Sequence, residues 1–228
     1  MSYNTMETLD ILEIFLNEHP GVQSLTFCSY PKQVLIQNEL ALTGATSHFV
    51  NSALKIREKY RLPFWDSLML SFFDKKDVPE ELLKRAWLHN KNINKQRISN
   101  INIIRNLIDN NQCDNISLNS EIILKNGDIK HFFLIDFHVS QSENNLDTIS
   151  KVIRLLQLTG YILDSGQSYH FISDRFYVFD EMLDLLAKSL LYSPLIDRAW
   201  IAHQIMERSC SIRVGEKNSQ RPYFIKKI

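Results

Sequence analysis

The sequence predicts an α+β fold, and three observations support this prediction. Apolar residues recur at helical spacing through most of residues 1–111, whereas strand-like runs dominate after that point. Asn126-Gly127 separates two of these runs, and this dipeptide is the strongest short signal for a β-hairpin. Two amphipathic helical segments, 142–160 and 176–191, alternate with the later strands. We therefore expect a helix-rich module over 1–112 and an α+β module over 113–228, joined in one compact unit.

The N-terminal half is expected to consist mainly of helices. A first helix is indicated by the spacing of Met6, Leu9, Leu12 and Leu16, and Pro20-Gly21 ends it. Residues 22–42 are consistent either with two short strands or with one strand and a loop, and the pattern does not decide between them. Further helices are expected over 47–60, from Pro63, from an Asp77 cap and over 98–108.

The C-terminal half is expected to build the sheet. Strands are predicted at 121–125 and 129–139, and the second is apolar on both faces, which is typical of a central, doubly covered strand. Gly160 is expected to end the helix over 142–160. Strands at 161–163 and 169–172, the helix over 176–191, and short strands near 211–214 and 223–226 complete the module.

Composition excludes several classes of protein. The chain has 228 residues with 26 basic and 26 acidic side chains, so it is not broadly polybasic. It contains neither glycine-rich nucleotide-binding motif, and its three cysteines favour neither a disulfide framework nor a four-cysteine zinc site. No signal-peptide layout and no apolar run of about 18 residues is present. We therefore expect a cytoplasmic protein that does not enter a membrane.

A first candidate for chemistry is Asp136-Phe137-His138. In a strand, residues two apart point to the same side, so Asp136 and His138 are expected to emerge together. An aspartate within such an apolar strand is costly to bury unless it is paired or binds a metal ion. The alternative is a strand end at which the aspartate reaches water.

A second candidate is the segment from Ser165-Gly166 to His170. Small residues predict a tight turn, where backbone N–H groups and hydroxyls hold anions, and His170 lies on the strand that leaves it. The alternative is an ordinary hairpin turn with a half-exposed histidine.

A third candidate is Leu195-Ile196-Asp197 with the basic segment after it. Arg208, Arg213 and Lys217 are suited to neutralising a triphosphate, arginine through its bidentate geometry. The alternative is a helix-capping aspartate and a solvated basic edge.

In this order, the three segments resemble the motifs of the archaeo-eukaryotic primase superfamily. Its members carry a hydrophobic-Asp-x-Asp/Glu motif, then a Ser-x-His motif, commonly within Ser-Gly-x-x-x-His, and then a hydrophobic-Asp motif. The matches are Leu134-Ile-Asp136-Phe-His138, Ser165-Gly-Gln-Ser-Tyr-His170 and Leu195-Ile-Asp197. The resemblance covers about the second half of the chain, and it implies an RRM-like mixed or antiparallel sheet on which the N-terminal module packs.

The chain departs from this pattern at His138, where the family has a second carboxylate. Mg²⁺ prefers oxygen ligands, whereas an imidazole suits Mn²⁺ better. Either the metal preference shifts, or another acid such as Asp164 substitutes, or polymerase activity is lost.

The resemblance implies a primase-polymerase-like nucleotidyltransferase. Asp136, His138 and Asp197 would bind divalent Mn²⁺ or Mg²⁺ and carry catalysis. The nucleotide-binding residues would be Ser165, Gly166, His170, Arg213 and Lys217, with Arg208 less directly involved. Nucleoside triphosphates and single-stranded or primed nucleic acid would be the substrates, and a helicase or another replication or defence protein a partner. The basic stretch that would hold the template comprises Lys84, Arg85, Lys91, Lys95 and Arg97. The alternative is a catalytically degenerate module that binds nucleotide or nucleic acid within such an assembly.

Overall fold

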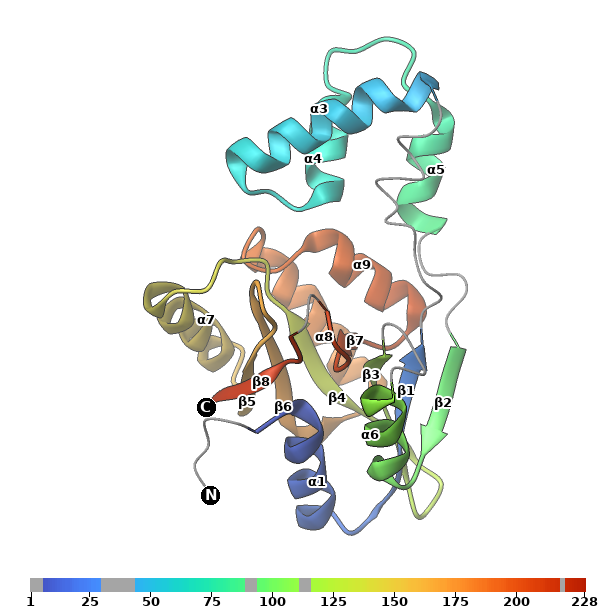
Figure 1. Ribbon diagram of the computed structural model, residues 1–228, viewed down its shortest axis with the longest axis vertical. Helices are drawn as coiled ribbons and strands as arrows, with labels where there is room; N and C mark the ends of the chain where they lie inside the picture. Colours follow the sequence, from blue (N-terminus) through green and yellow to red (C-terminus); the bar gives the residue numbers. More distant parts are fainter. Residues whose placement is uncertain (1–5, 30–43, 89–93, 111–115, 218–219) are drawn as a thin grey trace. The chain divides into compact units, whose positions relative to one another are not determined.

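The computed structural model describes residues 6–29, 44–88, 94–110, 116–217 and 220–228, and they form two compact units (Figure 1). The larger unit comprises Met1–Pro31 and Ile93–Ile228, and the smaller one comprises Lys32–Asn92. The N-terminal half therefore contributes residues to both units. The boundaries of these units differ from the boundary at residue 112 that the sequence predicts. Among the described residues, no helix has the length and apolar character needed to cross a membrane.

One eight-stranded sheet forms the centre of the larger unit. Its strands are β1 (Val22–Ser29), β2 (Asn94–Ile98), β3 (Ile116–Leu124), β4 (Ile129–Asp136), β5 (Gly160–Asp164), β6 (Tyr169–Tyr177), β7 (Ser211–Arg213) and β8 (Tyr223–Lys227). They follow the order β2-β1-β3-β4-β6-β5-β8, with β7 paired to β3, and every strand pair is antiparallel. The predicted α+β class is confirmed.

Strand β3 has two partners along the same edge, and this split shapes the centre of the sheet. Its second half pairs with the start of β4, where Glu121 lies opposite His131. Its first half pairs with β7, where Ser117 lies opposite Arg213. Because both partners are antiparallel to β3, β4 and β7 run in the same direction and end at the same side of the sheet. The ends of these two strands, Asp136 and Arg213, are thereby brought to one region.

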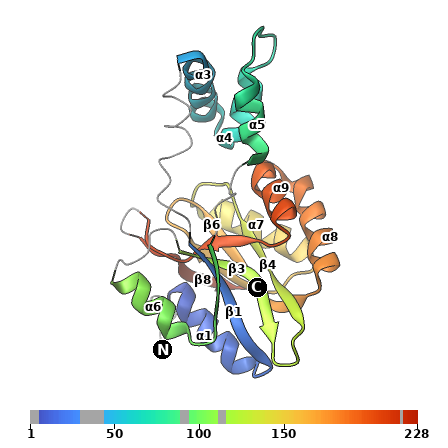
Figure 2. The ribbon, with the colours of Figure 1, turned by 90° about the vertical axis from the view of Figure 1, so that its right-hand side faces the viewer.

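Helices cover both faces of the sheet (Figures 1 and 2). The helices are α1 (Thr8–Glu18), α6 (Ile101–Asp109), α7 (Glu143–Leu155), α8 (Phe179–Ser189) and α9 (Arg198–Glu207), with a 3-10 turn at Leu190–Tyr192. Phe132 of β4 lies 4.6 Å from Phe15 of α1 between ring centroids, whereas the neighbouring His131 lies 6.0 Å from Phe179 of α8. Adjacent strand residues thus meet helices on opposite faces, so β4 is the central, doubly covered strand that its sequence predicts.

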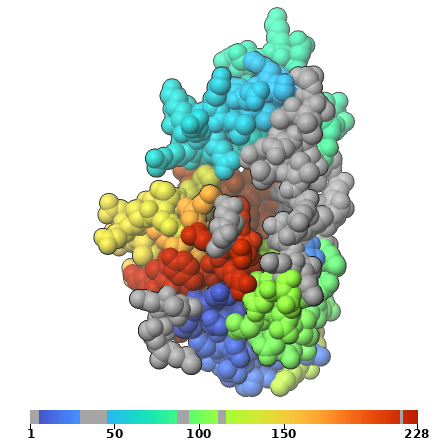
Figure 3. Space-filling model, in the orientation of Figure 1, coloured from blue at the N-terminus to red at the C-terminus, as the bar shows by residue number. Residues whose placement is uncertain are grey.

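The C-terminal segment lies against helices α1 and α6. Glu7 and Tyr223 form an antiparallel bridge, and the Arg221 guanidinium is 2.8 Å from the Asp109 carboxylate at the end of α6. Figure 3 shows this side of the molecule, with the C-terminal residues in red directly beside α1 in blue and α6 in green. The edge strand β8 is therefore held at its start by the residue before α1, and the segment before β8 is held by the end of α6.

Several local predictions are confirmed, and two are corrected. Asn126-Gly127 forms the turn between β3 and β4, with Gly127 at a φ of 89°. Gly160, however, does not end α7, which already stops at Leu155. It begins β5, where a Cβ atom would lie 2.1 Å from the carbonyl oxygen of Ile172. Strand β6 continues to Tyr177 instead of ending near residue 172, so the following helix begins later than expected.

In the N-terminal half, the structure decides one open question and adds one strand. Val22–Ser29 forms the single strand β1, and residues 30–42 of the undecided segment lie outside the described residues. The edge strand Asn94–Ile98 was not predicted. Nearly every residue in it is exposed, so its side chains show no apolar alternation that could have signalled a strand.

The smaller unit contains α3 (Gly44–Tyr60), α4 (Phe64–Ser71) and α5 (Glu80–Leu88). A separate apolar cluster holds these helices together, formed by buried Phe49, Val50, Ala53, Leu68 and Leu82. The unit thus has a small core of its own.

Candidate active site

Two residues of the predicted site face each other across neighbouring strands. Asp136 is the last residue of β4, and the register places it directly opposite His170 of β6. The His170 Nε2 atom lies 3.5 Å from the Asp136 Oδ1 atom. His170 is only 4% exposed, whereas the Asp136 side chain keeps 44% of its surface accessible. Antiparallel pairing therefore joins the first and second motifs through a buried imidazole and a carboxylate that solvent still reaches.

The surroundings of this pair shift both of its pKa values. Loss of hydration, and then the nearby Asp197 charge, raise the pKa of Asp136 to about 7, although Lys217 and Arg213 oppose this. Burial, reinforced by the charges of Arg213 and Lys217, lowers the pKa of His170 to about 3. His170 is therefore neutral at pH 7, and its contact with Asp136 is a long polar contact and not an ion pair.

These shifts predict an unusual pH dependence of stability. Between about pH 4 and 6.5, an unfolded chain carries a proton on His170, whereas the folded chain carries one on Asp136. These opposite shifts should largely offset each other in the wild type, because the folded and unfolded states would each bind about one proton.

In the Asp136→Asn variant, only the lowered pKa of His170 still makes stability depend on pH in this range. Its free energy of unfolding, relative to wild type, should fall by up to about 1.4 kcal/mol for each pH unit of acidification in this range. His170→Gln leaves only the raised aspartate pKa, so its relative stability should fall as the pH rises. Urea midpoints at pH 4.5, 5.5 and 6.5 measure both slopes, and slopes of the same sign would contradict the assigned shifts.

The third motif joins this pair through the backbone beyond β4. Phe137 forms an antiparallel bridge with Ile196, and the His138 N–H donates to the Leu195 carbonyl over 2.7 Å. Asp197 follows at once and caps α9, with its Oδ1 atom accepting hydrogen bonds from the N–H groups of Ala199 at 2.8 Å and Trp200 at 3.4 Å. Its charge also acts on Asp136, so the helix-cap role and a place in the site are compatible.

His138 is half-buried just after β4. Among the residues that the structure describes, no three His, Cys, Asp or Glu side chains are grouped so that they could hold a metal ion. The described residues therefore show no ready-made three-ligand group at Asp136, His138 and Asp197. A role for His138 as a metal ligand stays a prediction.

The turn of the second motif is held by Arg213. The Arg213 guanidinium donates to the carbonyl oxygen of Ser165, to that of Gly215 at 2.7 Å and to that of Gln220 at 3.2 Å. Gly166 has a φ of 95°, and a Cβ atom there would lie 2.7 Å from the Gln220 side-chain oxygen. Arg213 therefore ties this turn to the segment after β7, and Gly166 permits the close approach.

Arg213 and Lys217 also act electrostatically on the aspartate–histidine pair, as their effects on both pKa values show. Arg208 does not take part. It ends α9 in the left-handed conformation, and its guanidinium stacks over the Phe179 ring, 4.1 Å from the centroid. Of the three predicted cations, two therefore act on the aspartate–histidine pair and one packs against Phe179 of α8.

Asp164 does not substitute for a missing carboxylate. In the β5–β6 register, Asp164 lies opposite Tyr169, whereas Leu163 lies opposite His170, so alternation sends Asp164 to the other face from His170. Its oxygens accept hydrogen bonds from the Gly166 N–H at 2.7 Å, the Tyr223 hydroxyl at 2.8 Å and the Gln141 amide. Asp164 holds the turn together instead.

Two features of the site were not predicted from the sequence. The His170 Nδ1 atom is buried and finds no hydrogen-bond partner among the described residues. Ser168 lies within the second motif but had no assigned role, and its hydroxyl bonds to the backbone on both sides of His138. The Ser-x-His spacing was the available signal for Ser168.

The predicted basic stretch is divided between the two units. Lys95 and Arg97 lie on β2, where Lys95 donates to Ser209 at 2.8 Å and Arg97 pairs with Glu121 at 2.9 Å. Lys84 and Arg85 lie on α5 and form ion pairs with glutamates one turn earlier in that helix. Lys91 lies outside the described residues. The template-binding role of this stretch stays a prediction.

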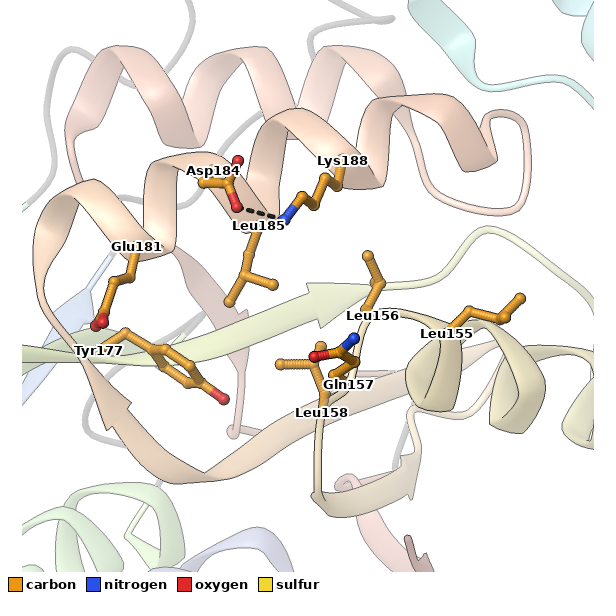
Figure 4. Close-up of a pocket in the computed structure, with 9 residues that line it drawn as sticks. All are labelled: Leu155, Leu156, Gln157, Leu158, Tyr177, Glu181, Asp184, Leu185 and Lys188. Carbon is orange, nitrogen blue, oxygen red and sulfur yellow. Dashed lines mark ion pairs between the residues drawn. The ribbon is translucent and has the colours of Figure 1, made fainter.

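A hollow of about 490 Å³ opens elsewhere in the larger unit (Figure 4). Its lining comes from the end of α7 and the residues after it, from the end of β6 and from α8. It includes Leu155, Leu158, Tyr177, Leu185 and the ion pair between Asp184 and Lys188. None of the predicted site residues lines it. We therefore place the candidate active site by the chemistry of its residues and not by the size of this hollow.

Comparison with known proteins agrees with the resemblance seen in the motifs. The family model for archaeo-eukaryotic primase 1D-like proteins matches residues 95–226, which include all of β2 except Asn94 and all three motifs. No curated protein and no solved structure gives a significant match. Since the family match spans more than half of the sequence, this chain belongs to the archaeo-eukaryotic primase 1D-like, or AEP-like, family.

Proposed function

We propose that this protein is a primase-polymerase-like nucleotidyltransferase, which transfers nucleotides to the 3′-hydroxyl of a nucleic acid with a divalent metal ion. The observation that carries this proposal is the contact of Asp136 with His170, acted on by the charges of Asp197, Arg213 and Lys217. Anionic and cationic groups meet there beside an unpartnered imidazole nitrogen. This combination suits a ligand that carries both phosphate and a metal ion.

The donor set at Asp136 and Asp197 is consistent with a hard divalent cation. Asp197 disfavours ionisation of Asp136, so a cation between them would relieve the repulsion. When bound, such an ion supplies charge stabilisation at the α-phosphate and activation of the attacking hydroxyl. His138 is the proposed third ligand, and Mn²⁺ or Mg²⁺ the proposed ion.

The remaining residues are proposed to bind the triphosphate. A neutral imidazole has a single N–H group. If that group is at Nδ1 of His170, this buried nitrogen gains a partner when it donates a hydrogen bond to a phosphate oxygen. Ser165 and Gly166 supply the turn, and Arg213 holds it in place. Lys217 is exposed and brings a positive charge to the same region. Nucleoside triphosphates and single-stranded or primed nucleic acid are the proposed substrates.

A second candidate function is a binding module without catalysis. It is favoured by the histidine at position 138 and by the missing three-donor group among the described residues. We also propose a cytoplasmic location, in keeping with the free, buried thiols of Cys28 and Cys210. A helicase or another replication or defence partner stays a prediction from the sequence alone.

Nucleotide incorporation separates the two functions. Primer extension is measured with Mn²⁺ and with Mg²⁺, alongside nucleotide affinity by calorimetry. Extension with either ion supports the transferase. Nucleic-acid binding without extension under either condition supports the binding module.

The change His138→Asp tests the metal preference. An imidazole favours Mn²⁺ over Mg²⁺, whereas a carboxylate restores an oxygen ligand, so the ratio of Mg²⁺- to Mn²⁺-supported rates should rise in this variant. His138→Ala is the control, and it should lower the rate with both ions. If the wild type is fully active with Mg²⁺ and His138→Ala has no effect, His138 is not a ligand.

A further inference from the structure

Helix α3 of the smaller unit ends in a group of basic residues that the family match does not include. The match begins at residue 95, whereas the smaller unit ends at Asn92. Residues 44–61 contain four basic side chains and one acidic side chain, that of Glu58. The basic residues and the tyrosine among them form a surface that we call the α3 basic patch: Lys55, Arg57, Lys59, Tyr60 and Arg61. This part of the chain therefore carries a local positive charge, although the whole sequence is neutral.

The four cations of the α3 basic patch have no carboxylate partner among the residues that the structure describes. Four basic residues on other helices do have one, and in each case the acid lies one turn earlier, in the pairs Lys84–Glu80, Arg85–Glu81, Lys151–Asp147 and Lys188–Asp184. In the patch, the residues four positions before the cations are Asn51, Ala53, Lys55 and Arg57. None of these is acidic, so the charges are left uncompensated.

This arrangement is unfavourable for the helix itself. Lys55 and Lys59 are exposed and lie one turn apart, where like charges repel each other. The helix dipole favours cations only within the last turn, which includes Arg57 and Lys59 but not Lys55. Helix stability therefore does not account for these charges, whereas a bound polyanion would offset them.

Tyr60 places an exposed aromatic ring among the cations. Whole helical turns separate it from the core residues Phe49 and Ala53, so it lies on the same face of α3. Those two residues are buried, whereas Tyr60 is 59% exposed. Helix α3 has 17 residues and spans about 25 Å, but α4 has 8 residues and spans about 12 Å, so α4 cannot cover all of this face. The Lys59 ammonium lies 4.8 Å from the centroid of the Tyr60 ring, so ring and charge share one surface.

We propose that the α3 basic patch binds single-stranded nucleic acid, with its cations on the phosphates and the Tyr60 ring stacked on a base. The uncompensated charges favour a polyanion, and the exposed ring favours one that carries flat aromatic groups. Bases in a duplex are stacked on one another, so an unpaired strand is the form that offers a free base. The patch holds the single-stranded part of the substrate, an identity that rests on the proposed function.

Strand affinity, measured on the full chain, tests the cations. A fluorescently labelled oligothymidylate is titrated by anisotropy without nucleotide or divalent ion. At about 0.1 M salt, Lys55→Gln/Lys59→Gln should bind it roughly ten- to thirtyfold more weakly, and the slope of log affinity against log salt should fall by about 1.4, or about 0.7 for each phosphate contact. Glutamine retains the helix propensity of lysine, so α3 should stay folded.

The matched control for these charges is Lys151→Gln/Lys188→Gln. It removes the same net charge from exposed cations that are already paired with acids, and it should bind the strand like the wild type. Unchanged affinity in Lys55→Gln/Lys59→Gln, or an equal loss in the control, would overturn the proposal. Failure of the wild type to bind the strand would overturn it as well.

The role of Tyr60 is tested with an abasic strand that has the same number of phosphates. The wild type should prefer the oligothymidylate. Tyr60→Ala should bind it roughly five- to a hundredfold more weakly and lose this preference, whereas Tyr60→Phe should keep both. Equal affinity of the wild type for the two strands contradicts stacking. Displacement of the strand by an oligoglutamate as readily as by unlabelled oligothymidylate would instead identify an acidic protein as the partner.

These measurements separate the α3 basic patch from the proposed catalysis. If the wild type binds the strand as expected but extends no primer, the transferase proposal fails and the patch remains. If it extends primers while Lys55→Gln/Lys59→Gln binds the strand with wild-type affinity, the patch is overturned and the transferase proposal remains.

Discussion

Replacing Asp197 by asparagine is expected to reduce nucleotide incorporation at least a hundredfold while leaving the protein folded. Asparagine caps helices about as well as aspartate, so the start of α9 should be retained. The negative charge beside Asp136 is lost, however, and groups that stabilise charge in the transition state are typically worth a hundred- to a thousandfold in rate. Primer extension and a urea midpoint on the same preparation measure both effects.

Asp197→Ala is the companion variant, and it should lose both the charge and the cap. Its incorporation should be as low as that of Asp197→Asn, but it should also lose about 1 kcal/mol of stability. Nucleic-acid affinity should be retained in both variants, because the residues proposed to bind the nucleic-acid backbone do not include Asp197. If Asp197→Asn extends primers at the wild-type rate, Asp197 serves only as a helix cap and the catalytic proposal loses its second carboxylate.

The second large effect is expected for Gly160→Ala, which should severely destabilise the larger unit. A Cβ atom at this position would lie 2.1 Å from the Ile172 carbonyl oxygen and 2.8 Å from the Ser173 Cα atom, both in the backbone. The φ of 153° is also one that side-chain-bearing residues rarely adopt. Relief requires β5 and β6 to separate, at a cost on the order of 3 kcal/mol or more. The pairing of Leu163 with His170 lies in the same ladder.

Thermal and urea unfolding measure this loss, with Gly21→Ala as the control. No atom lies within 4 Å of a Cβ atom placed at Gly21, so that change should be nearly neutral. A Gly160→Ala variant with wild-type stability would mean that β5 and β6 are not held in the register described.

The candidate site was largely predictable because its motifs are local in sequence. Asp136 at the end of an apolar run, His170 after a small-residue turn and Asp197 after an apolar pair are each visible within about six residues. The sequence pattern allowed the alternative, purely structural roles equally well. For Asp197 the helix-cap role and a place beside Asp136 are compatible, since Asp197 caps α9 and its charge also acts on Asp136. Local pattern cannot separate such roles, because a helix cap and a ligand require the same carboxylate.

Other features could not be read from local pattern. Asp164 and Arg208 are close in sequence to site residues, yet alternation turns Asp164 away from His170, and Arg208 stacks on Phe179. Gly160 looked like a helix end, because helix ends and crowded strand crossings both favour glycine. Glycine is needed at position 160 because the backbone of Ile172, in the next strand, comes too close to leave room for a Cβ atom.

The sequence by itself determined the α+β class, the Asn126-Gly127 hairpin, the central position of β4 and the family motifs, because all of these depend on periodicity and residue type over short stretches. Only the tertiary structure decided that β1 and β2 from the N-terminal half complete the sheet, that Asp136 lies opposite His170, and that Arg213 and Ser168 hold the motifs together. These features depend on strand register and on contacts between residues far apart in the chain. No local pattern records such contacts, because their energy comes from partners that folding alone brings together.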